Sequence, residues 1–165
     1  FLDCNFTDAV FRKCKFIDCS FIRCNLSLVK VPQTQFTDVA FDECKLVGVD
    51  WTKAAWSKLV FSAPLTFCQC ILNDSSFFGL SLDEVVLEAC KAHDVDFREG
   101  SFCRANFAHT DFTSSLFART NLTGADFSEA ANYDIDIFNN KIGQAKFNRY
   151  EAVRLLACLD IELVD

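Results

Sequence analysis

Two histidines, His93 and His109, carry the side chains best suited to acid–base catalysis near neutral pH. Serine, threonine and aspartate residues recur around both, so a Ser, a His and an Asp brought together by folding would resemble the triad of a hydrolase. The sequence contains no nucleophile elbow, no Gly-rich phosphate loop and no His-Glu-x-x-His motif. We therefore expect a protein that is not an enzyme and that binds no cofactor.

Ten cysteines are the other residues that could do chemistry. In a secreted protein they would predict disulfides, whereas a cytosolic setting keeps thiols reduced. Cys68 and Cys70 are expected to face opposite ways, one inward and one outward, which argues against a zinc site built on this pair. Seven cysteines stand where corresponding stretches have Ala, Ser, Thr or Val, which indicates small buried side chains: Cys4, Cys14, Cys19, Cys24, Cys44, Cys70 and Cys90. We expect free thiols, no metal site and a cytoplasmic protein.

A large apolar residue returns at every fifth position over most of the chain, most clearly from Ala105 to Phe127. A small residue stands two positions before each large one, and Asn or Asp often stands between them. A period of five fits neither a helix nor a strand, so the chain must turn after each unit. If each unit forms one side of a square coil, all the large residues point to the axis and about twenty residues complete a turn. The sequence therefore predicts an all-β solenoid whose coils pair at about 4.8 Å.

The five-residue register runs from Phe1 to Phe61 and resumes from Phe67 to Phe127, displaced by one position. We therefore expect a single extra residue near Pro64, in a bulged corner. Two units have weak inward residues, Val31 and Ala92. These units are either local irregularities or contact sites for a partner, because binding segments concentrate where regular structure is interrupted.

The period dissolves after Ala130, and the chain is expected to change structure there. We divide it into a repeat domain, residues 1–131, and a C-terminal cap, residues 132–165. The cap is predicted to contain a turn-rich link, one last repeat-like unit ending at Phe147, and a helix capped by Asn148. A short strand is predicted to follow at Asp160–Leu163, where apolar and acidic residues alternate.

The recurring pattern of a small residue, Asp or Asn, and Leu or Phe resembles that of the pentapeptide-repeat proteins. This resemblance implies a right-handed quadrilateral β-helix. The quinolone-resistance (Qnr-type) and microcin B17 immunity proteins of that family act on bacterial DNA gyrase and topoisomerase IV as acidic mimics of DNA. They form dimers through a C-terminal helix and strand, and the tail of this chain looks like theirs. The resemblance therefore implies a homodimer interface formed by Leu155, Leu156, Leu159, Ile161 and Leu163. Qnr-type proteins often carry longer loops than the single extra residue expected here.

The net charge of the chain and the positions of its carboxylates indicate which class of partner it binds. The net charge of −7 and the pI near 4.8 argue against direct binding to nucleic acid, and no apolar run is long enough to predict a membrane span. Counting in twenties places several carboxylates on one side of the coil, so we expect a partner-binding acidic face formed by Asp3, Asp42, Glu43, Asp83 and Glu84. Two functions remain open. One is a DNA mimic that binds type II topoisomerase and gives quinolone resistance or toxin immunity, and the other is an interaction scaffold with a different protein partner.

Overall fold

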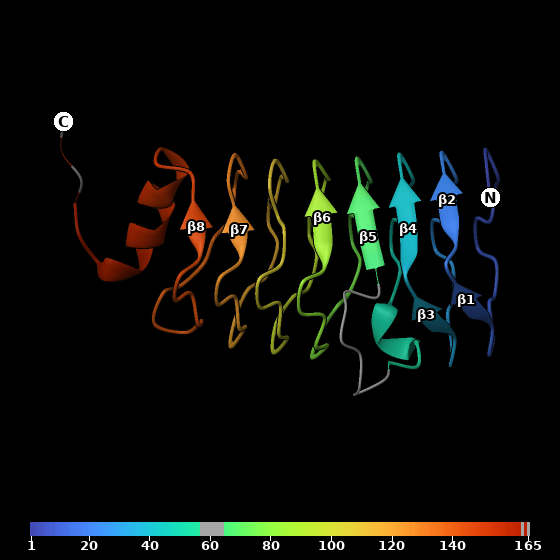
Figure 1. Cartoon of the computed structure of the whole chain (residues 1–165). Helices are drawn as coiled ribbons and strands as arrows, with labels where there is room; N and C mark the ends of the chain where they lie inside the picture. Colours follow the sequence, from blue (N-terminus) through green and yellow to red (C-terminus); the bar gives the residue numbers. More distant parts are fainter. Residues whose placement is uncertain (57–64, 163, 165) are drawn as a thin grey trace.

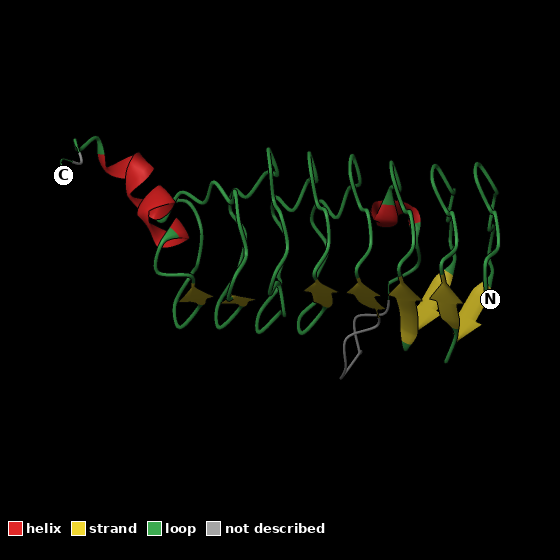
Figure 2. Ribbon diagram, turned by 90° about the horizontal axis from the view of Figure 1, so that it is seen from above, coloured by secondary structure: helices red, strands yellow, loops and turns green. Residues whose placement is uncertain are grey.

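A computed structural model describes residues 1–56, 65–162 and 164. The chain forms a β-solenoid in which coils stack along one axis and the two termini lie at opposite ends (Figure 1). Figure 2 shows the same stack from above, with a helix at its C-terminal end. The solenoid predicted from the five-residue period is therefore confirmed.

Neighbouring coils pair in parallel, and paired residues are usually twenty positions apart. Strand β1 (Lys15–Ile17) pairs with β3 (Gln35–Thr37), and β2 (Ser20–Ile22) pairs with β4 (Val39–Asp42). Single bridges join the other two sides of the same coils, at Asn5 with Asn25 and at Val10 with Lys30. These contacts recur at five-residue intervals, so each coil has four sides.

The large inward residues form columns of aromatic rings along the axis. The rings of Phe21 and Phe41 stack with their centroids 5.0 Å apart, and Phe77 stacks on Phe97 at 5.4 Å. All four side chains are buried. The small inward residues are buried as well, and their polar groups find partners: the Thr110 hydroxyl donates a hydrogen bond to the Leu87 carbonyl at 2.6 Å. The core is therefore a continuous apolar column with hydrogen-bonded polar groups such as the Thr110 hydroxyl at its corners, and two buried polar atoms, Trp51 Nε1 and the Tyr133 hydroxyl oxygen, have no partner among the described residues.

The insertion in the middle of the chain is longer than the sequence analysis predicted. Strand β5 (Leu65–Cys68) pairs with β4 so that Phe41 lies opposite Phe67, which is 26 positions later instead of twenty. Six extra residues therefore enter this coil, and the prediction of a single one was wrong. A period of five cannot distinguish the two cases, because six residues are one full unit plus one. Phe61 and Pro64 lie outside the described residues.

The coil continues beyond the boundary expected at residue 131. Strand β6 (Val86–Glu88) follows β5 in the sheet, and β7 (Asp126–Phe127) pairs with β8 (Lys146–Phe147) twenty positions later. The segment expected to be a turn-rich link pairs with the preceding coil, through bridges from Phe117 to Ile135 and from Asn121 to Lys141. Tyr133 and Ile135 are buried in the core. The five-residue period is not visible here because Tyr133 and Ile135 do not stand at the positions that the period gives to large inward residues.

Two short helical segments occur in the described residues, η1 (Trp51–Lys53) and η2 (Glu151–Leu159). The predicted cap Asn148 lies two residues before the N-cap of η2, which is Tyr150 and makes no side-chain capping bond; the Asn148 side-chain oxygen accepts a hydrogen bond from the Tyr150 amide at 2.9 Å. The predicted strand at Asp160–Leu163 is not formed by its described part: Asp160 has a positive φ of 49° and ends the helix, and residues 160–162 are irregular. Leu163 lies outside the described residues.

No helix within the described ranges is both long and apolar enough to cross a membrane.

Candidate interaction surfaces

The acidic face predicted from the sequence does not exist as a single side. We call the side formed by β2, β4, β5, β6, β7 and β8 the strand face, and it carries Asp3, Asp42 and Glu43. Asp83 and Glu84 lie on the side before it in the coil, because Leu87 and not Leu82 stacks on Phe67. The cause is the six-residue insertion, which moves every later residue one side further than a one-residue insertion would.

The two displaced carboxylates are engaged by the next coil. The Asp83 carboxylate accepts hydrogen bonds from the Ser101 hydroxyl at 2.6 Å and from the Cys103 amide at 2.9 Å. Glu84 forms an ion pair with Arg104 at 2.9 Å. Both groups therefore link neighbouring coils, and this use reduces what they offer to a partner.

The strand face carries other acidic side chains that the sequence analysis missed, Glu88, Asp126 and Glu129. Glu88 follows the buried Leu87 on β6, and the other two flank Phe127. Lys146 donates to the Asp126 carboxylate at 2.8 Å, and this contact with the Ser128 hydrogen bond lowers the pKa of Asp126 to about 2. Counting the chain in coils of twenty residues, with an insertion of six residues before Phe67, would have placed these acids on the strand face.

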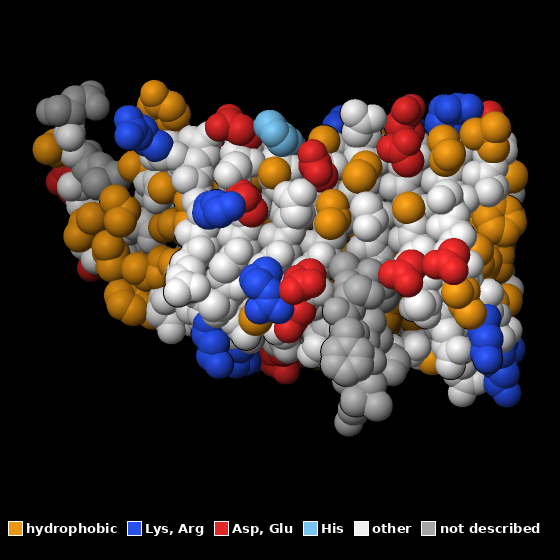
Figure 3. Space-filling view, in the orientation of Figure 1, with side chains coloured by type: hydrophobic (Ala, Val, Ile, Leu, Met, Phe, Trp, Pro, Cys, Tyr) orange, Lys and Arg blue, Asp and Glu red, His pale blue; other side chains and the backbone are white. Residues whose placement is uncertain are grey.

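Four carboxylates of the strand face have no ion pair with a cation in the described ranges: Asp42, Glu43, Glu88 and Glu129. Asp3, by contrast, pairs with Arg23 at 2.8 Å, which lowers the pKa of Asp3. Figure 3 shows the molecule from this side, with acidic side chains scattered among basic and uncharged ones. The face thus offers carboxylates spaced along the stack of coils.

His93 takes part in a link between coils. Its Nε2 atom lies 2.9 Å from Asp111 Oδ2, and Asn132 donates to the other carboxylate oxygen at 2.9 Å. Burial alone would raise the pKa of Asp111, but hydrogen bonds from Asn132, Thr113 and His93 together hold it well below its usual range. No described serine bonds to His93, so the candidate triad is not assembled, and His109 is exposed on the strand face.

Four of the ten cysteines are buried and lie in one column of small inward residues: Cys24, Cys44, Cys70 and Cys90. All ten are free thiols, and the Cys24 amide donates to the Cys44 sulfur at 3.3 Å, one coil away. The hydrogen bond with Cys70, followed by burial, raises the pKa of Cys44. Thiols with raised pKa values are poor nucleophiles and poor metal ligands. Across the described residues, no three His, Cys, Asp or Glu side chains gather where they could hold a metal ion.

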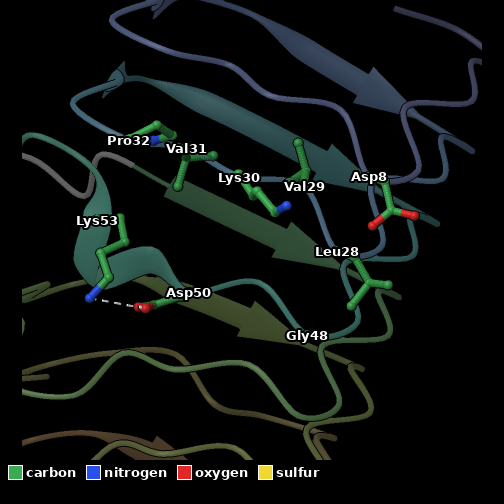
Figure 4. Close-up of a pocket in the computed structure, with 9 residues that line it drawn as sticks. All are labelled: Asp8, Leu28, Val29, Lys30, Val31, Pro32, Gly48, Asp50 and Lys53. Atoms are coloured by element: carbon green, nitrogen blue, oxygen red, sulfur yellow. Dashed lines mark ion pairs between the residues drawn. The ribbon is translucent and has the colours of Figure 1, made fainter.

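A groove of about 470 Å³ lies at the first weak unit, the one with Val31 (Figure 4). Its lining comes from three successive coils: Asp8, Leu28, Val29, Lys30, Val31, Pro32, Gly48, Asp50 and Lys53. Figure 4 shows Lys30 between Val31 and Leu28, and the ion pair of Lys53 with Asp50 at 3.3 Å. Val31 and Ala92 are both buried in the core, and the hollow described here lies at the Val31 unit.

The predicted dimer residues surround helix η2. Leu155 packs partly against the core, Leu156 and Leu159 are half-buried, and Ile161 is 55% exposed. Leu163 lies outside the described residues. Figure 3 shows hydrophobic side chains gathered around this end of the molecule. No side chain of η2 is fully buried, so the helix covers the last coil while leaving apolar surface uncovered.

Two solved structures of QnrB1 have an architecture similar to that of this chain. Among solved structures, a trypsin-treated form of QnrB1, a plasmid-mediated fluoroquinolone resistance protein, matches with a TM-score of 0.72 and 19% identity, over 99% of this chain and 87% of that one. Full-length QnrB1 matches with a TM-score of 0.53 and 20% identity, over 98% and 87%. HetL from the cyanobacterium Nostoc sp. strain PCC 7120, involved in heterocyst differentiation regulation, has a TM-score of 0.47 and 14% identity, over 90% and 86%.

At these identities the structural likeness concerns the fold and not the partner. No curated protein matches the sequence. A family profile does match: the profile of the pentapeptide repeat region aligns with residues 1–64 and 60–127, which together make up most of the chain. The five-residue period, the four-sided coil and this match lead to one conclusion: the chain belongs to the pentapeptide-repeat family.

Proposed function

We propose that this protein binds bacterial type II topoisomerase, DNA gyrase or topoisomerase IV, as a mimic of DNA. The observation that carries the proposal is the row of strand-face carboxylates that form no ion pair with a described residue: Asp42, Glu43, Glu88 and Glu129. They recur at every second coil, which is about 10 Å along the axis. Phosphates follow one another at about 3.4 Å along a DNA strand, so the row reproduces roughly every third one.

A rigid coil suits this task. The carboxylates stand on backbone that is hydrogen-bonded to the coils on either side, so their spacing is fixed before binding. Binding then costs little ordering entropy, and the acidic groups attract a basic DNA-binding surface over a distance of about 10 Å at physiological salt. The net charge of −7 also favours attraction of the whole protein to such a basic surface.

The test of this proposal is an enzyme assay with purified gyrase. Supercoiling of relaxed plasmid is measured with and without this protein, and with and without a quinolone. A DNA mimic is expected to change supercoiling at micromolar concentration, by protecting the enzyme from the quinolone or by inhibiting it directly. Supercoiling that is unchanged in all four conditions would contradict the proposal and favour an interaction scaffold with another partner.

The proposal includes a two-fold homodimer formed by the C-terminal end. Apolar surface around η2 is of the kind that marks an interface, since Val153 is 52% exposed and Ile161 is 55% exposed. Leu156→Asp is expected to convert the dimer to a monomer in sedimentation at micromolar concentration, because a charge would be buried there without a partner. Leu116→Asp is the control, because Leu116 is an exposed leucine, at 46%, that lies in the coil stack away from helix η2. A wild type that sediments as a monomer would refute the dimer.

A further inference from the structure

The groove at the Val31 unit contains a leucine that the fold does not require. Leu28 has a positive φ of 61° and is 48% exposed. A branched apolar residue is strained in this left-handed conformation, which Gly, Asn and Asp adopt more readily. The other coils place glycine or small polar residues at the same corner, all with positive φ: Asp8, Gly48, Asp74, Asp94 and Ser114. Leu28 is thus the one apolar member of its column.

Neighbouring residues make Leu28 part of a defined apolar hollow. A Cβ atom added to Gly48 would lie only 2.7 Å from the Leu28 Cδ2 atom, so the two corners are in close contact. Leu28, Val29, Val31 and Pro32 line the hollow together, and because Val29 and Val31 are buried in the core, Leu28 and Pro32 provide its exposed apolar surface. An exposed hollow of this kind gains free energy when a ligand covers its apolar surface.

Basic side chains lie in the groove and on the coil before it, although the net charge of the chain is negative. Lys30 and Lys53 line it, and Arg12 and Lys13 stand on the coil before it. The Lys13 amide donates to the Pro32 carbonyl at 3.0 Å, which places Lys13 directly beside the groove. Asp8 and Asp50 are the acidic members of the lining, and Asp50 is already paired with Lys53. The lining thus holds two lysines and two aspartates, and the coil before it adds two cations, in a chain whose net charge is −7.

We propose that this groove binds a short acidic peptide segment with one branched apolar side chain. The apolar side chain covers Leu28 and Pro32, and flanking carboxylates pair with Lys30 and Lys13. The lining extends over three coils, from Asp8 through Leu28 to Gly48, which is two coil spacings or about 10 Å. This length accommodates about three residues of an extended peptide. This site is separate from the strand face, so a variant can lose one activity without the other.

Fluorescence polarisation tests the proposal with a defined probe. The probe is a fluorescein-labelled, end-blocked peptide of sequence Glu-Asp-Leu-Glu-Asp, titrated with the full chain. Saturable binding is expected with a Kd on the order of 100 µM, falling as salt rises. Leu28→Ser is expected to weaken binding about tenfold, and Lys30→Ala by about threefold to tenfold. Ser114 shows that serine is tolerated at this corner with a φ of 59°, so Leu28→Ser is expected to fold.

Matched controls separate the groove from general surface effects. Leu116→Ser removes an exposed leucine elsewhere, and Lys15→Ala removes an exposed lysine from another side of the coil. Both protein variants are expected to leave peptide binding unchanged. Two altered peptides are expected to bind the wild-type protein at least tenfold more weakly: one with lysine in place of its acidic residues, and one with serine in place of its leucine. The proposal is overturned if the acidic peptide does not saturate below roughly 1 mM. It is also overturned if Leu28→Ser and Lys30→Ala both bind it like the wild type.

Discussion

Phe77→Ala is expected to lower the free energy of unfolding by about 3–5 kcal/mol. The ring of Phe77 is completely buried, and it stacks between Trp51 and Phe97 at centroid distances of 5.9 and 5.4 Å. Removing it leaves a cavity in the middle of the column, and the backbone hydrogen bonds between coils prevent the neighbouring coils from closing it. Chemical denaturation followed by circular dichroism measures the loss.

The next residue supplies the matched control. Phe78 points outward, is 42% exposed, and lies under the Arg98 guanidinium at 5.8 Å. Phe78→Ala removes the same ring but leaves no internal cavity, so its cost is expected to stay below about 1 kcal/mol. Equal losses for the two variants would contradict the assignment of Phe77 to the inside of the coil.

Much of the fold could be predicted because the buried residues repeat at a period that only a coil satisfies. The inward columns, including Phe21, Phe41 and Phe97, follow from the position of large residues alone. The last coil could not be predicted in this way. Tyr133 and Ile135 fill its core out of step with the fives, and their burial depends on pairing with the coil beneath. The period of the sequence gives the spacing of large residues along the chain, and it carries no information on the pairing between coils.

The candidate sites were less predictable than the fold, for two physical reasons. The side on which a carboxylate stands depends on the total number of residues per coil, and the five-residue period conceals the extra unit before Phe67. Glu88 was therefore missed and Asp83 misplaced. The groove depends on a surface hollow, which Val31 and Pro32 signalled only as a weak unit. Leu28 could have been noticed from the sequence as a leucine at a corner that is usually polar.

Reversing the four strand-face carboxylates that pair with no described cation is expected to weaken binding to gyrase by a hundredfold or more. The variant carries lysine at Asp42, Glu43, Glu88 and Glu129, which changes the net charge from −7 to +1. Its effect is large because each reversal replaces an attraction to a basic surface by a repulsion, over several groups at once. Titration of labelled protein against gyrase at two salt concentrations measures the loss, and the wild type is expected to bind more weakly at the higher salt. Folding is expected to survive, because all four side chains point outward.

A second variant with the same net charge distinguishes mimicry from attraction to charge in general. It carries lysine at four exposed acids on other sides of the coil: Asp18, Asp38, Asp74 and Asp94. These positions have positive φ, as does the natural lysine Lys13, so lysine is compatible with the corner. If gyrase recognises the strand face, this variant loses less than about tenfold in affinity while the first loses far more. If both variants lose the same affinity for gyrase, net charge alone attracts the enzyme, and the proposal that the strand face mimics DNA is refuted.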